Sequence, residues 1–99
     1  MDARTAYERL RELQVIDVRE QEELEEGFIE GAVNIPLYQL GYRISELEAA
    51  KPVLTVCQTG QRSAEAAEML ASNGFEAHNL DGGMWGWKMR RLPVVEPGS

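Results

Sequence analysis

The sequence predicts an α/β fold, in which a small parallel sheet is covered on both faces by helices. Two observations carry this prediction. Short β-branched runs alternate with stretches of helical periodicity, and the run Val53–Val56 carries no charge, as expected for a strand buried on both faces. The length of 99 residues fits one domain, and no Pro/Gly/Ser-rich linker divides it. We expect a single domain over residues 1–99, with a flexible tail from about residue 93.

The first half of the chain alternates between predicted helices and strands. Apolar residues recur at helical spacing over Ala3–Leu13, and Val15–Val18 follows as a β-branched strand. The segment Glu20–Glu26 is rich in helix formers and ends at Gly27, a suitable C-cap. We expect Ala32–Pro36, which follows, to be extended.

The second half repeats this alternation. A stripe of leucine and isoleucine residues predicts a helix over Leu37–Ala50, and Pro52 marks its end. The remaining predicted elements are a strand over Val53–Val56, a helix over Ser63–Asn73, a strand over Phe75–Leu80 and a final short helix over Met84–Arg91. Ligands of parallel sheets bind outside the carboxyl ends of the strands. Cys57, directly after a strand, is therefore placed where chemistry usually occurs.

Charge and hydropathy narrow the classes of function. Ten Lys and Arg residues against 17 Asp and Glu residues give a net charge of −7, which disfavours nucleic acid and anionic membranes as partners. No apolar run has the length of a signal peptide or a membrane span, so we expect a cytoplasmic protein. We interpret the dense acidic run Glu20–Glu30 as a solvated, solubilising face. A monomer is expected, since no exposed apolar stripe is evident.

Cys57 is the only cysteine, so the thiol is either a buried filler or a chemical group, and an internal disulfide is impossible. The strand, the glycine-containing loop after it and the start of the next helix form an anion cradle, whose N–H groups lower the pKa of a thiol. Arg62 adds a full positive charge to this effect. A cation at a helix start is unfavourable by itself, and an anion beside it would relieve the conflict. We therefore predict a substantially ionised Cys57.

The pattern Cys57-x-x-Gly60-x-Arg62-Ser63 resembles the active loop of single-domain rhodaneses, which are sulfurtransferases. Further segments are similar to motifs of that family, in the same order along the chain: Val15-Ile16-Asp17-Val18-Arg19, Gly31-Ala32-Val33-Asn34-Ile35-Pro36, and Leu80-Asp81-Gly82-Gly83 with Trp85 and Trp87. The resemblance covers nearly the whole chain and implies a three-layer α/β/α rhodanese-like fold. One departure is Phe28, at a position where the family commonly has histidine.

The resemblance implies that Cys57 accepts a sulfane sulfur from thiosulfate or a persulfide and then passes it to a thiol, a protein acceptor or cyanide. Cys57 and Arg62 would be the catalytic residues. The loop backbone would hold the outer sulfur through Gln58, Thr59, Gly60, Gln61, Arg62 and Ser63. Because the variable loop positions are uncharged, thiosulfate is expected to be a poorer donor than a persulfide. No metal or cofactor is expected.

Two other functions remain open at this point. A binding module of the same fold would have no turnover, although the loss of Cys57 or Gly60 that would favour it is not found. A small cysteine phosphatase would need a loop wide enough for phosphate and an acid for the leaving oxygen. The four residues between Cys57 and Arg62 argue against that loop, because the related phosphatase loops are one residue longer.

Several other residues are interpreted as structural. Asp17 and Arg19, near a strand end, are expected to form a structural ion pair. His78 is the only histidine and has no neighbouring cysteine or histidine with which to hold a metal. Trp85 and Trp87 could line the mouth of the active pocket or close the core, and packing in the core is the favoured interpretation.

Overall fold

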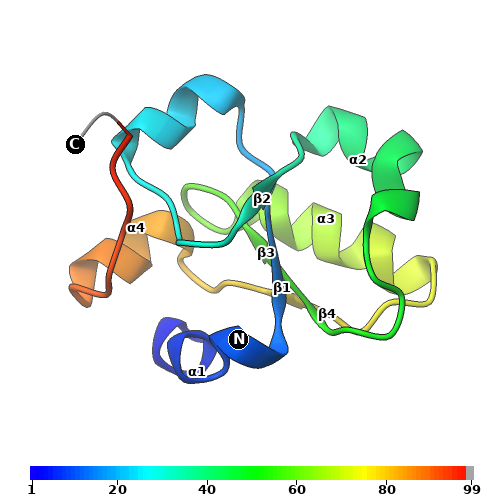
Figure 1. Cartoon of the computed structure of the whole chain (residues 1–99), viewed down its shortest axis with the longest axis horizontal. Coiled ribbons are helices and arrows are strands. Elements are labelled where there is room, and N and C mark those ends of the chain that lie inside the picture. Colours follow the sequence, from blue (N-terminus) through cyan, green and yellow to red (C-terminus); the bar gives the residue numbers. More distant parts are fainter. Residues whose placement is uncertain (98–99) are drawn as a thin grey trace.

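Four parallel strands form the centre of the fold. The computed structural model, described here for residues 1–97, contains one sheet in the order β2-β1-β3-β4 (Figure 1). The strands are β1 (Gln14–Asp17), β2 (Val33–Asn34), β3 (Val53–Val56) and β4 (Ala77–Asn79). All three pairings are parallel, so the carboxyl ends of the strands lie at the same edge of the sheet.

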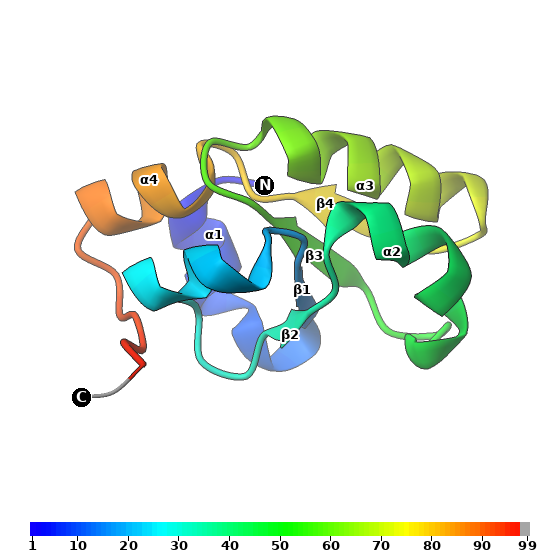
Figure 2. The same ribbon diagram turned by 90° about the horizontal axis from the view of Figure 1, so that it is seen from above.

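Helices cover both faces of the sheet, which confirms the three-layer α/β/α prediction. The helices α1 (Ala3–Glu8) and α4 (Gly83–Met89) lie over one face, and α2 (Leu37–Arg43) and α3 (Gln61–Ser72) lie over the other (Figures 1 and 2). Alternate side chains of β3 enter the two hydrophobic clusters, with Leu54 on the α1/α4 side and Val53 on the α2/α3 side. This burial on both faces explains why the strand carries no charge.

The two tryptophans have different environments. Trp87 is fully buried, and its ring meets Tyr7 edge-on with the ring centroids 6.0 Å apart. Trp85 is 60% exposed, so the prediction that both rings pack in the core is wrong for Trp85. The two residues are neighbours at i and i+2 on a short helix, and this spacing turns them to different sides.

Pro93 and Val95, in the predicted tail, contact the rest of the domain. Trp87 Nε1 donates a hydrogen bond of 2.8 Å to the carbonyl of Pro93. Val95 and Phe28 form an antiparallel bridge through two backbone hydrogen bonds of 2.9 and 2.8 Å. Residues 98 and 99, at the end of the predicted flexible tail, lie outside the described residues.

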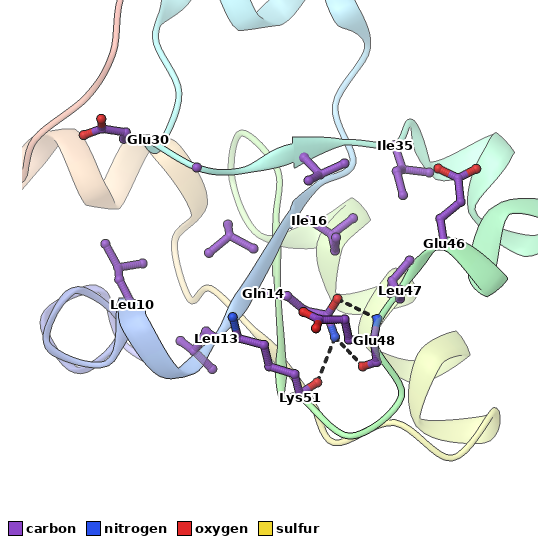
Figure 3. Close-up of a pocket in the computed structure, with 13 residues that line it drawn as sticks. Leu10, Leu13, Gln14, Ile16, Glu30, Ile35, Glu46, Leu47, Glu48 and Lys51 are labelled. Carbon is purple, nitrogen blue, oxygen red and sulfur yellow. Dashed lines mark hydrogen bonds between the residues drawn. The ribbon is translucent and has the colours of Figure 1, made fainter.

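Two predicted helices are shorter than expected. The first ends at Glu8 and continues as a 3-10 turn, and α2 ends at Arg43 instead of Ala50. After Arg43 the chain continues as a 3-10 turn over Ile44–Glu46, and Gln14 in β1 contacts the segment that follows. The amide of Gln14 donates to the carbonyls of Glu48 and Lys51 at 2.6 and 2.9 Å and accepts from the N–H of Glu48 at 3.0 Å (Figure 3). These contacts satisfy backbone groups of Glu48 and Lys51 without a helix.

The predicted helix over Glu20–Glu26 is a 3-10 helix over Gln21–Glu26 that begins with a capping box between Glu20 and Glu23. A buried arginine anchors this segment. Arg19 forms hydrogen bonds of 2.8–3.2 Å with the carboxylate of Asp17 and reaches the carbonyls of Glu23 and Gly27 at 3.3 and 2.9 Å. The predicted structural pair of Asp17 and Arg19 is confirmed. Over residues 1–97, no helix has the length and apolar character needed to cross a membrane.

Candidate active site around Cys57

Cys57 directly follows β3 at the carboxyl edge of the sheet, as predicted. The loop after it turns through Gly60, whose φ of +100° is a conformation that favours glycine. Helix α3 then begins at Gln61, two residues earlier than the sequence indicates, so Arg62 and Ser63 belong to its first turn. The hydroxyl of Thr55 in β3 donates to the carbonyl of Ser63 at 2.7 Å and fixes this turn against the sheet.

The sulfur of Cys57 lies among hydrogen-bond donors. It accepts from the N–H of Gly60 at 3.1 Å, from the N–H of Ser63 at 3.3 Å and from the Ser63 hydroxyl at 3.2 Å. Burial alone would raise the pKa of this thiol, but the Ser63 hydroxyl, followed by the N–H groups of Ser63, Gly60 and Thr59, holds the pKa below its ordinary value. The direction agrees with the sequence prediction, and hydrogen bonds are its main cause.

Asn79, at the end of β4, is a site residue that the sequence analysis missed. Its Oδ1 lies 2.5 Å from the Ser63 hydroxyl, and its Nδ2 donates to the carbonyl of Gly60 at 3.1 Å. The Ser63 hydroxyl has a single proton, which it can give either to Asn79 or to the sulfur of Cys57. The hydroxyl orientation is therefore coupled to the charge of the sulfur. The sequence feature that could have identified Asn79 is its position near the end of a predicted strand, on the same sheet edge as Cys57.

Arg62 forms a two-point ion pair with Glu23. Its Nη1 and Nη2 donate to the two carboxylate oxygens at 2.7 and 2.8 Å. These hydrogen bonds lower the pKa of Glu23 to about 2, against an opposing effect of burial. The same bonds are the main cause of a raised Arg62 pKa, to which the charge of Cys57 adds less. The anion expected beside Arg62 is thus a side chain of this protein, and the interpretation of the acidic run as purely solubilising is wrong for Glu23.

The glycines of the closing turn allow α4 to pack against the loop. The N–H groups of Met84 and Trp85 donate to the carbonyls of Cys57 and Gln58 at 2.9 and 3.0 Å. Gly83 has a φ of +57°, and a Cβ at this position would lie 2.5 Å from the carbonyl oxygen of Cys57. Only glycine permits this contact, so α4 packs directly against the loop that holds the sulfur.

The remaining predicted loop residues differ in their placement. The side chains of Thr59 and Gln61 are exposed, whereas Oε1 of Gln58 is buried and has no hydrogen-bond partner among the described residues. Their role in holding an outer sulfur atom stays a prediction.

A separate cavity of about 390 Å³ lies beside the amino end of β1 (Figure 3). Its walls combine apolar side chains with a charged rim, and they include Leu13, Ile16, Leu47, Glu30, Glu46 and Lys51. None of the residues from Cys57 to Ser63 lines it. The cavity is therefore separate from the candidate active site.

Comparisons with known proteins agree with this fold. A family model of the rhodanese-like domain matches residues 2–90. The Bacillus subtilis protein YqhL is 49% identical over 83 residues, which cover 81% of this chain and 66% of YqhL. A protein named sulfurtransferase from Allochromatium vinosum is 30% identical over 101 residues, which cover 98% of this chain and 94% of that protein.

A solved structure provides an independent comparison. The crystal structure of a rhodanese-related protein from Thermoplasma volcanium matches with a TM-score of 0.93 and 36% identity, and the match covers 96% of this chain and 95% of the other. The family match runs from the N-cap of α1 to the end of α4 and includes the whole Cys57 loop. The chain is therefore a member of the rhodanese-like domain family, which includes proteins named sulfurtransferases.

Proposed function

We propose that the protein is a rhodanese-type sulfurtransferase in which Cys57 carries the transferred sulfur as a persulfide. The observation that carries this proposal is the set of donors from Gly60 and Ser63, which lie 3.1–3.3 Å from the sulfur and favour its ionised form. The thiolate is the nucleophile that the reaction requires. The sulfurtransferase name of a full-length relative supports the same class of chemistry.

The reaction has two steps. In the first, the Cys57 thiolate attacks the outer sulfur of the donor, the donor S–S bond breaks, and the donor remainder leaves with the electron pair. In the second, an acceptor thiolate or cyanide attacks the outer sulfur of Cys57–S–SH and releases the Cys57 thiolate. The chain has no other cysteine, so the acceptor is an external molecule or a partner protein.

The cradle has a defined part in both steps. When the persulfide on Cys57 is deprotonated, its outer sulfur carries negative charge, and in the proposal the N–H groups from Gln58 to Ser63 hold that atom. In the proposal, Arg62 is the second catalytic residue, and its guanidinium, paired with Glu23, lies in the first turn of α3. All of these groups belong to one chain, so a monomer contains the complete site.

Access to the sulfur requires local movement. Cys57 is only 1% exposed, so a donor reaches it when side chains of the loop shift aside. This burial excludes water from the persulfide between the two steps and favours acceptors that can enter a narrow opening.

The test is the intact mass of the reduced protein before and after incubation with thiosulfate, and separately with a small thiol persulfide. We expect a gain of one sulfur atom that cyanide or reductant removes and that is absent in Cys57→Ser. If neither donor adds mass while the thiol still reacts with an alkylating agent, the proposal of a sulfur carrier fails. Turnover of an aryl phosphate without sulfur loading would instead indicate a phosphatase.

A further inference from the structure

We propose that Glu23 determines the donor specificity of this site: its ion pair with Arg62 masks the only charged side chain of the loop and disfavours anionic donors relative to uncharged ones. The donor class indicated is a thiol persulfide, R–S–SH, in preference to thiosulfate. This inference rests on the proposed function and adds to it the residue that selects the substrate.

The geometry of the pair leaves Arg62 poorly placed to receive a second anion. Both terminal nitrogens of its guanidinium donate to Glu23, at 2.7 and 2.8 Å, so the two-point face that would bind a sulfonate is occupied. No other residue from Cys57 to Ser63 carries a positive charge. A sulfonate arriving at the loop would have to displace Glu23 to find a cation.

Glu23 is held in place from two sides, which distinguishes this pair from a mobile surface ion pair. The N–H of Glu20 donates to its carboxylate at 2.8 Å, and Arg19 holds its backbone carbonyl at 3.3 Å. The side chains of Glu23 and Arg62 are 28% and 38% exposed, so the pair borders solvent at the first turn of α3. The carboxylate is therefore positioned before the donor arrives.

The surrounding charge acts in the same direction. Glu20 and Glu22 are exposed on the same segment, and the whole chain has a net charge of −7. With Arg62 neutralised, a dianion meets a negative field at the loop, whereas an uncharged molecule does not. The barrier is thus larger for the thiosulfate dianion than for a persulfide, whose sulfur carries at most one negative charge.

The two donor reactions differ in the charge that reaches the site. With thiosulfate, Cys57–S⁻ attacks the outer sulfur of S–SO₃²⁻ to give Cys57–S–S⁻ and SO₃²⁻, so two negative charges approach the thiolate. With a persulfide, Cys57–S⁻ attacks the outer sulfur of R–S–SH to give Cys57–S–SH and R–S⁻, and no additional charge enters. Masking of Arg62 penalises only the first reaction.

The decisive experiment compares alkylation of Cys57 by iodoacetate, an anion, and by iodoacetamide, its uncharged analogue. Both reagents take the same path to the sulfur, so the ratio of their rate constants isolates the effect of charge. We expect Glu23→Gln to raise the iodoacetate-to-iodoacetamide ratio roughly three- to tenfold at low salt, because an unpaired Arg62 attracts the anion. The increase should shrink in 1 M salt.

The matched control is Glu22→Gln, which removes the same charge from an exposed neighbour that does not contact Arg62. A large change with Glu23→Gln and a change below about twofold with Glu22→Gln would support the inference. An unchanged ratio in Glu23→Gln, or equal changes in both variants, would overturn it. Glu23→Asp keeps the charge but shortens the side chain, so a partial increase is expected if the two-point contact is what masks Arg62.

The second experiment measures the rate at which Cys57 gains a sulfur atom from thiosulfate and from a small persulfide whose R group is uncharged. Glu23→Gln should raise the rate with thiosulfate by a similar factor and leave the rate with the persulfide within about twofold. If neither donor loads Cys57 in any variant, the proposed function fails, whereas the alkylation ratio still decides whether Glu23 masks Arg62. Loading that increases equally for both donors would contradict the role of Glu23 in donor choice.

Discussion

Two arginine–carboxylate pairs stand close together in this domain, and they differ in burial. Arg19 and Asp17 are 0% and 1% exposed, whereas Arg62 and Glu23 are 38% and 28% exposed. The buried pair has its partners within the interior and fixes the segment after β1. The outer pair borders the candidate active site. The same chemistry therefore supports the fold in one place and adjusts the charge of the site in the other.

The largest expected effect comes from breaking the buried pair. Arg19→Met leaves the Asp17 carboxylate buried without its partner, so we expect the free energy of unfolding to fall by about 3–5 kcal/mol. Denaturant unfolding at neutral pH measures this loss. The double variant Asp17→Asn/Arg19→Met should recover part of it, because no uncompensated charge remains. A loss below about 1 kcal/mol in Arg19→Met would show that the two pairs do not differ as their burial indicates.

A second substitution tests whether the Cys57 loop is as tightly packed as the interior. Gly83→Ala places a Cβ 2.5 Å from the Cys57 carbonyl, so we expect a loss of about 2–3 kcal/mol in thermal or denaturant unfolding. Gly41→Ala is the control, because no atom lies within 4 Å of its Cβ and its backbone is helical. That variant should be neutral or more stable by up to about 1 kcal/mol. Equal behaviour of the two variants would contradict a rigid contact between loop and α4.

A third change separates hydrogen bonding from charge at the sulfur. Ser63→Ala removes the hydroxyl that lies 3.2 Å from Cys57 and should raise the pKa of the thiol, because the thiolate loses a donor. The pH profile of iodoacetamide alkylation measures the shift. Thr59→Ala is the control, since it keeps the backbone N–H and removes only an exposed side chain. An identical profile in Ser63→Ala and the wild type would indicate that the Ser63 hydroxyl donates its proton to Asn79 and not to the sulfur.

The smallest effect on stability is expected for the outer pair. Glu23→Gln should cost about 0.5–1 kcal/mol at neutral pH, after allowance for its exposure. Because the folded pKa of Glu23 is about 2 and its ordinary value is 4.5, this contribution is complete above pH 4.5 and is lost as the pH falls through 2. The difference between variant and wild type should therefore narrow over that range in denaturant unfolding. A difference that stays constant down to pH 2 would contradict the low pKa.

The sequence alone predicted the strand before Cys57, the loop and the family to which the chain belongs. These features depend on neighbouring residues, such as the uncharged run of β3 and the spacing of Cys57, Gly60 and Arg62. The parallel sheet also followed from the alternation of elements. The helix that was predicted to reach Ala50 ended at Arg43 and passed into a 3-10 turn, and Gln14, 34 residues from Glu48, binds the backbone of the segment after that turn.

Tertiary structure decided which groups surround the sulfur and which anion faces Arg62. Glu23 lies 39 residues from Arg62 along the chain, and Asn79 lies 16 residues from Ser63. Strand order and the packing of separate segments bring these residues together. The local periodicity of the sequence does not predict contacts between residues so far apart. The Cys57 loop is thus encoded within a few consecutive residues, whereas Glu23 and Asn79 come from distant segments that meet the loop only in the folded protein.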